Sequence, residues 1–136
     1  ILIAHGMGEH GGRYEALAKE LNNHGFDVLA HDQRGHGGSR FGASQSGDMG
    51  YDGWNESLAD LQFLHHWLEE TYAKPTVLLG HSMGAMMAQQ YLYRYLLKQD
   101  QLALKIDLGR SCNVRQSITV FKFYNFLFYY FISPNV

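Results

Sequence analysis

Three short apolar runs stand out in the first eighty positions of the chain, at residues 1–4, 26–30 and 76–79. Glycine, proline or polar residues border each run, which is typical of strand ends. The runs are largely continuous rather than alternating, a pattern expected when both faces of a strand are covered. We therefore expect three short, buried strands.

Helical periodicity fills the segments that follow these runs. Apolar side chains recur at three- and four-residue spacing in segments 14–21, 54–72 and 84–97, which predicts amphipathic helices. The alternation of strands and helices indicates an α/β fold, a parallel sheet with crossover helices. The residues suited to cap or stop the helices are Gly25, Asp52 or Asn55, and Pro75.

The alternation of predicted strands and helices ends at residue 97. Residues 102–106 could form a fourth strand, and residues 118–132 form an apolar, aromatic run that is shorter than a membrane span. A disordered or strand-like tail is the simplest interpretation of this run, because a membrane-interface anchor would need a basic face. We therefore expect a partial domain over residues 1–108 and an irregular, aromatic-rich tail over residues 109–136.

Composition narrows the class of protein. The 136 residues suffice for one domain, and 46% hydrophobic with 18% charged residues permit a packed core. A net charge of −2 is unlike that of nucleic-acid-binding proteins, and we expect no nucleic-acid partner. The single cysteine, Cys112, excludes an internal disulfide framework and suits the cytoplasm. No signal-peptide pattern is visible, so the expected location is cytoplasmic or peripheral to a membrane.

The sequence Gly80-His81-Ser82-Met83-Gly84 fits the G-x-S-x-G pattern of a nucleophile elbow. It directly follows a predicted strand and precedes a predicted helix, the context that the elbow requires. A sharp turn would lift Ser82 Oγ toward a substrate, while Gly80 and Gly84 would let the two backbones approach closely. The Met83 amide, at the helix N-terminus, would stabilise an oxyanion. The alternative is a purely structural tight turn.

A second oxyanion donor is expected in His5-Gly6-Met7-Gly8, the loop after the first apolar run. Hydrolases with such an elbow place another oxyanion-hole N–H in this loop, and Met7 would supply it. Removing one such donor typically slows catalysis by about 10²–10³. A His-Gly pair alone carries little information, so this assignment depends on its pairing with the elbow.

Several stretches occur in a recognisable order and spacing. They are His5-Gly6-Met7-Gly8-Glu9-His10, Arg13-Tyr14, His31-Asp32-Gln33-Arg34-Gly35-His36-Gly37 and Gly80-His81-Ser82-Met83-Gly84. Together they resemble the monoacylglycerol lipase and lysophospholipase group of α/β-hydrolases, also called the serine aminopeptidase S33 type. The resemblance covers roughly residues 1–95, and the tail at 109–136 lies outside it.

The resemblance implies that Ser82 is the acyl-accepting nucleophile and that Met7 and Met83 are the two backbone oxyanion donors. It implies hydrolysis of carboxylic esters of glycerol and related lipids through an acyl-serine intermediate, with no metal and no organic cofactor. The implied partner is a small-molecule lipid ester; peripheral membrane contact and the oligomeric state are left open. For the loop at residues 32–37 it implies a role in shaping the site, without catalysis.

The histidines near the first loop do not indicate a metal site. His5, Glu9 and His10 follow an H-x3-E-H spacing, which is one residue longer than the H-x-x-E-H spacing of zinc proteases. They also lie in a glycine-rich loop, whereas metal ligands at that spacing need a helix. We therefore expect no metal at these residues.

Two other groups of histidines are also expected to be structural. His65 and His66 are adjacent on a predicted helix, where neighbouring side chains point apart, so a shared ligand site is not expected. His81 precedes the serine of the elbow but should pack away from its hydroxyl. Neither group is assigned a chemical role.

No histidine follows His81, although the implied fold takes its base from a histidine placed after the nucleophile and the acid. Asp100 and Asp107 are left unassigned. The chain also opens inside a predicted strand without a methionine, so we expect a truncated piece that lacks the catalytic acid and histidine. A frameshift, a misread exon boundary or a truncated gene product would explain the change in composition. We expect little or no turnover by this chain alone. The alternative is a non-catalytic fragment that at most binds a lipid or a partner.

Overall fold

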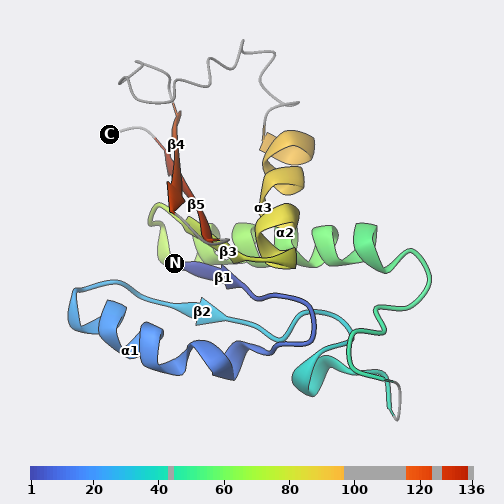
Figure 1. Cartoon of the computed structure of the whole chain (residues 1–136). Coiled ribbons are helices and arrows are strands. Elements are labelled where there is room, and N and C mark those ends of the chain that lie inside the picture. The colour runs from blue at the N-terminus through green and yellow to red at the C-terminus, as the bar shows by residue number, and fades with distance from the viewer. Residues whose placement is uncertain (43–44, 97–115, 124–126, 135–136) are drawn as a thin grey trace.

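The computed structural model describes residues 1–42, 45–96, 116–123 and 127–134, with side chains described up to residue 95. The helices and strands follow one another as Figure 1 shows. In order they are β1 (Leu2–Ala4), the 3-10 turn η1 (Gly11–Tyr14), α1 (Glu15–Asn23), β2 (Leu29–Ala30), the 3-10 turn η2 (Gly37–Ser39), α2 (Gly53–Tyr72), β3 (Val77–His81), α3 (Met83–Tyr91), the π-helical turn η3 (Leu92–Leu96), β4 (Gln116–Phe123) and β5 (Leu127–Pro134).

The sheet has the strand order β2-β1-β3-β5-β4, and its first three strands are parallel. Leu2 of β1 pairs with Leu29 on one side and with Leu78 on the other, so β1 is central among the three. This confirms the expected α/β fold with a parallel sheet. Strand β2 is shorter than the predicted 26–30, because β1 is only three residues long and offers few partners.

Two further strands extend the sheet beyond β3. Strand β5 runs antiparallel to β3 and β4 runs antiparallel to β5, so the two form a hairpin at the β3 edge (Figure 1). Over these two ranges the tail is strand-like, which is one of the two forms that the sequence predicts, and it is regular where an irregular tail was expected. Unpaired backbone groups at a sheet edge favour such an addition, and this segment has strong β-propensity. The possible strand at 102–106 lies outside the described residues.

The hydrophobic core lies between β1, β3 and the two helices α2 and α3. Apolar side chains from all four elements are fully or almost fully buried in one cluster, while α1 buries no residue completely. Packing of the strands against α2 and α3 therefore positions the β3–α3 junction. The core residues are Leu2, Ala4, Leu58, Leu61, Leu78, Met83, Met87, Ala88, Tyr91 and Leu92.

The helix boundaries follow the predicted signals closely. Helix α1 ends shortly before Gly25, which adopts a φ of 85°. Helix α2 begins after Asp52, which adopts a left-handed conformation and accepts a hydrogen bond from the Asn55 side chain at 2.5 Å. It ends ahead of Pro75, as expected. In the described part of the chain, no helix combines the length and the apolar character needed to cross a membrane.

Candidate active site

Ser82 occupies the sharp turn between β3 and α3. Its φ and ψ are 52° and −117°, an unfavourable conformation for a residue with a side chain. Its carbonyl accepts the Ala85 and Met86 N–H groups at 3.0 and 3.2 Å, so Ser82 also begins α3. Its side chain is exposed to solvent. The strand–turn–helix context that the elbow pattern requires is therefore present.

The two glycines of the elbow lie where backbones pass closest. A Cβ at Gly80 would overlap the Gly84 carbonyl and the Ala85 backbone. A Cβ at Gly84 would overlap the carbonyls of Ala4 and His5. Helix α3 can thus pack directly on β3 and β1 only because both positions lack a side chain.

His5 is a buried structural residue whose hydrogen bonds determine its tautomer. Its Nε2 accepts the Gln33 N–H at 3.0 Å, so the ring proton resides on Nδ1, which donates to the Gly6 carbonyl at 2.8 Å. Burial lowers the pKa of His5, which favours the neutral ring. The Gln33 side chain in turn donates to the His5 carbonyl at 2.5 Å. These contacts hold the end of β1 against the loop after β2.

The loop after β1 forms a tight turn beside Ser82. The Glu9 N–H donates to the Gly6 carbonyl at 3.2 Å, and Gly8 supplies the positive φ, 74°, that the turn requires. A Cβ at Gly6 would lie only 3.2 Å from the Ser82 Cβ. Met7 therefore lies in a loop that touches the elbow, with a side chain that is 54% exposed.

The structure brings the sequence-selected residues together at one end of the sheet. Met83 is the first residue of α3, so its N–H is among the four that lack a partner within the helix. Ser82, Met83 and the Met7 loop thus meet at the ends of β3 and β1. The chemical roles of Ser82, Met7 and Met83 remain predictions.

Sequence reasoning missed the main role of Glu9. The sequence suggested this residue only as an improbable metal ligand, whereas its carboxylate contacts His81 Nδ1 at 3.2 Å. It also accepts hydrogen bonds from Gly6 and Tyr14. Burial acts to raise the pKa of Glu9, but hydrogen bonds from Gly6, Tyr14 and His81 lower it to about 2. No periodicity marks this contact, because Glu9 and His81 are 72 positions apart.

The loop after β2 is held by a different carboxylate. Asp32 accepts the Gly11 N–H through Oδ1 and the Gly38 N–H through Oδ2, both at 2.7 Å. Arg34 reaches α2 through two parallel hydrogen bonds to Asp60, at 2.9 and 3.0 Å. These contacts give the loop a defined shape, and its role in shaping the site remains a prediction.

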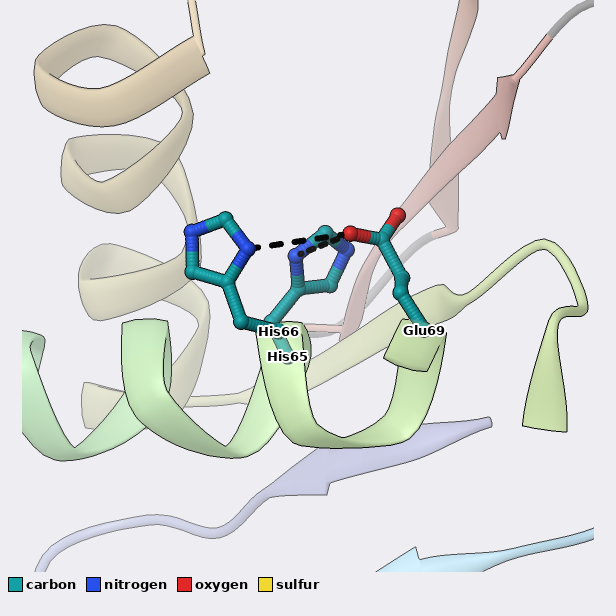
Figure 2. A group of neighbouring side chains, drawn as sticks. All are labelled: His65, His66 and Glu69. Atoms are coloured by element: carbon teal, nitrogen blue, oxygen red, sulfur yellow. Dashed lines mark ion pairs between the residues drawn. The ribbon is translucent and has the colours of Figure 1, made fainter. Parts of the chain in front are cut away.

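A second polar cluster lies on α2, where His65, His66 and Glu69 meet (Figure 2). The two Nδ1 atoms lie 3.6 and 3.9 Å from the same Glu69 oxygen. The expectation that His65 and His66 point apart and share no contact is therefore wrong. Glu69 lies four positions after His65 and three after His66, so both rings reach the same carboxylate. The Tyr91 hydroxyl is 2.9 Å from His65 Nδ1 and competes with any cation for that nitrogen. The cluster can join α2 to α3 through hydrogen bonds.

Comparison with known proteins agrees with this geometry. The sequence pattern of the family Hydrolase_4, serine aminopeptidase S33, matches residues 1–118. The human monoglyceride lipase is 38% identical over 89 residues, which are 65% of this chain and 28% of that protein. A monoglyceride lipase homolog from Monkeypox virus is 37% identical over 89 residues, 65% of this chain and 30% of that protein.

A bacterial lipase is also similar to this chain. The monoacylglycerol lipase of Mycolicibacterium smegmatis is 33% identical over 96 residues, which are 70% of this chain and 32% of that protein. The chain thus spans about a third or less of the curated relatives that it matches. The family match covers both the loop after β1 and the elbow, and it extends past residue 108, the boundary that composition suggested. The chain therefore belongs to the serine aminopeptidase S33 family of α/β-hydrolases.

Proposed function

We propose that Ser82 is the nucleophile of a carboxylic ester hydrolase of the monoacylglycerol lipase or lysophospholipase type. The observation that carries this proposal is the strained, exposed Ser82 at the β3–α3 turn, beside a Gly6 where an added Cβ would lie 3.2 Å from the Ser82 Cβ. Strained conformations of this kind persist where the surrounding structure enforces them, and they cluster at active sites. The names of the relatives support a lipid ester as the substrate.

The proposed reaction has two steps. Ser82 Oγ attacks the ester carbonyl and loses its proton to a base, and the amides of Met7 and Met83 stabilise the oxyanion that forms. The bond between the carbonyl carbon and the alcohol oxygen then breaks, and the alcohol leaves with a proton. Water attacks the acyl-serine, releases the carboxylic acid and restores the Ser82 hydroxyl.

Apolar side chains beside the site support a lipid substrate. Met7 is 54% exposed, and Met86, one turn along α3 from Ser82, is 56% exposed. Such side chains would contact an acyl chain or a lipid surface favourably. We propose on this basis that the protein acts at a lipid or membrane surface.

The proposal assigns no residue to the general base that accepts the Ser82 proton or to the acid that orients this base. Within residues 1–42 and 45–95, Ser82 Oγ makes no hydrogen bond to a histidine. No histidine follows His81 in the 136 residues. We therefore propose that this chain alone hydrolyses esters slowly, since the oxyanion hole without a base gives only a small rate gain over water. The second candidate is a non-catalytic chain that at most binds a lipid or a partner, and the exposed Met7 and Met86 side chains favour it.

An alkyl fluorophosphonate tests the proposed nucleophile. Ser82 Oγ would form a bond to phosphorus, the phosphorus–fluorine bond would break, and the serine proton and fluoride would leave to solvent. We expect mass spectrometry to find the adduct on Ser82, with no adduct after Ser82→Ala and an unchanged adduct after Ser39→Ala, an exposed serine in η2. Absence of labelling, together with absence of hydrolysis of a short-chain ester, would favour the non-catalytic alternative.

A further inference from the structure

Glu9 is an almost buried carboxylate that takes no part in the proposed bond-making steps. Its side chain is 10% exposed, and Oε2 accepts hydrogen bonds from Gly6 N–H at 3.0 Å, the Tyr14 hydroxyl at 2.9 Å and His81 Nδ1 at 3.2 Å. Oε1 lies 2.9 Å from the Arg13 guanidinium. A carboxylate is unfavourable in such a place unless donors surround it, so these contacts stabilise its charged form.

Glu9 holds the peptide units on both sides of Gly6. Its side chain accepts the Gly6 N–H, and its own N–H donates to the Gly6 carbonyl at 3.2 Å. His5 Nδ1 donates to that same carbonyl at 2.8 Å. Because a trans peptide is planar, a fixed Gly6 carbonyl makes the Met7 N–H point to the opposite side. The Glu9 backbone N–H, together with His5 Nδ1, thus sets the direction of the Met7 N–H, while the Glu9 carboxylate holds the adjoining peptide bond before Gly6.

The same carboxylate also reaches the elbow. A Cβ at Gly6 would lie 3.2 Å from His81 Nδ1, 3.2 Å from Ser82 Cβ and 3.3 Å from Glu9 Oε2, so these groups meet at one point. His81 directly precedes Ser82 at the end of β3. The contact between Glu9 and His81 therefore joins the loop after β1 to the turn after β3.

We propose that Glu9 is a positioning residue, which orients the peptide bond between Gly6 and Met7 for the oxyanion and anchors this loop to His81. The proposal rests on the proposed function of Ser82, but it concerns the loop and not the reacting atoms. If the carboxylate only stabilised the fold, its removal would lower the melting temperature without changing the rate at which the folded protein is labelled at Ser82.

The test replaces Glu9 by glutamine in the full chain. Gln has the same size, but a neutral amide cannot accept three hydrogen bonds at one oxygen as strongly as a carboxylate does. The matched control is Glu15→Gln, an exposed residue of α1 paired with Lys19. The measurements are hydrogen exchange at the Gly6 amide, the rate of labelling at Ser82 by an alkyl fluorophosphonate, and the melting temperature.

In the wild-type chain we expect the Gly6 amide to exchange at least about tenfold more slowly than the amide of exposed Gly8. Glu9→Gln should remove this protection and slow labelling by roughly 10- to 100-fold, as expected when an oxyanion donor is misplaced. Glu15→Gln should change neither. An unprotected Gly6 amide in the wild type, or unchanged Gly6 exchange in folded Glu9→Gln, overturns the proposal.

Two further results separate the possible failures. If Glu9→Gln does not fold, Tyr14→Phe removes one donor to the carboxylate and should speed Gly6 exchange severalfold, while an unchanged rate overturns the proposal. If the wild type is not labelled but Gly6 protection depends on Glu9, the function proposed for Ser82 fails and the positioning of the loop by Glu9 stands. If labelling of the wild type and Glu9→Gln is equal and Gly6 is unaffected, the positioning role alone fails.

Discussion

Gly84 in α3 lies against the backbone carbonyl of Ala4 in β1, with no space for a side chain between them. We therefore predict that Gly84→Ala lowers the free energy of unfolding by about 3 kcal/mol, since backbone on both sides prevents relaxation. Chemical denaturation would measure this. Gly38→Ala is the control, because a Cβ there meets only Asp32 Oδ2, at 3.5 Å, and its cost should be well under 1 kcal/mol.

The strain at Ser82 predicts an unusual stability order among its variants. Glycine tolerates a φ of 52°, whereas alanine does not, so Ser82→Gly should be about 1 kcal/mol more stable than Ser82→Ala. Both variants should lose fluorophosphonate labelling. Thermal unfolding of the two proteins side by side provides the measurement, and a less stable glycine variant would contradict the interpretation of the turn as strained.

His31 makes the stability of the fold depend on pH. Burial, with a contribution from His5, lowers the pKa of His31 to about 4, against about 6.5 in an unfolded chain. Between these two values the unfolded state binds more protons, so the free energy of unfolding falls as the pH drops from about 6.5 to 4, by at most about 3 kcal/mol.

Denaturation at pH 7.0, 5.5 and 4.5 would measure this dependence on pH. His31→Gln should make the curve shallower in this window, and the remaining slope comes from His5 and His65, whose pKa values burial also lowers. His24→Gln, at an exposed position of the α1 C-cap, is the comparison variant. Equal slopes for the wild type and His31→Gln would contradict the assignment to this residue.

The paired hydrogen bonds from Arg34 to Asp60 predict that lysine cannot replace the arginine. A single ammonium cannot make both contacts, so Arg34→Lys should reduce the free energy of unfolding by about 1 kcal/mol. Lys19→Gln, which breaks the highly exposed pair with Glu15, is the comparison and should cost less than Arg34→Lys, because solvent screens an exposed pair. Urea titration of both variants tests the difference.

Local patterns were sufficient for the elements that carry the site. Helix α2 begins and ends within a residue of its predicted range, because apolar spacing and a following Pro75 are local signals. The elbow likewise follows from the spacing of Gly80, Ser82 and Gly84 between a strand and a helix. Local patterns do not predict the length of β2, because that length depends on how much of β1 is available for pairing.

Contacts across the fold could not be predicted from local spacing. The Glu9–His81 contact exists because β1 and β3 are parallel neighbours, which brings the loop after one strand to the turn after the other. The convergence of His65 and His66 on Glu69 is local by contrast, because both pairs lie about one helical turn apart on α2. The sequence by itself thus determined the elbow and its flanking helices, because their signals are local. Only the tertiary structure decided which distant groups surround Ser82, because strand pairing sets the distance between residues that are far apart in the sequence.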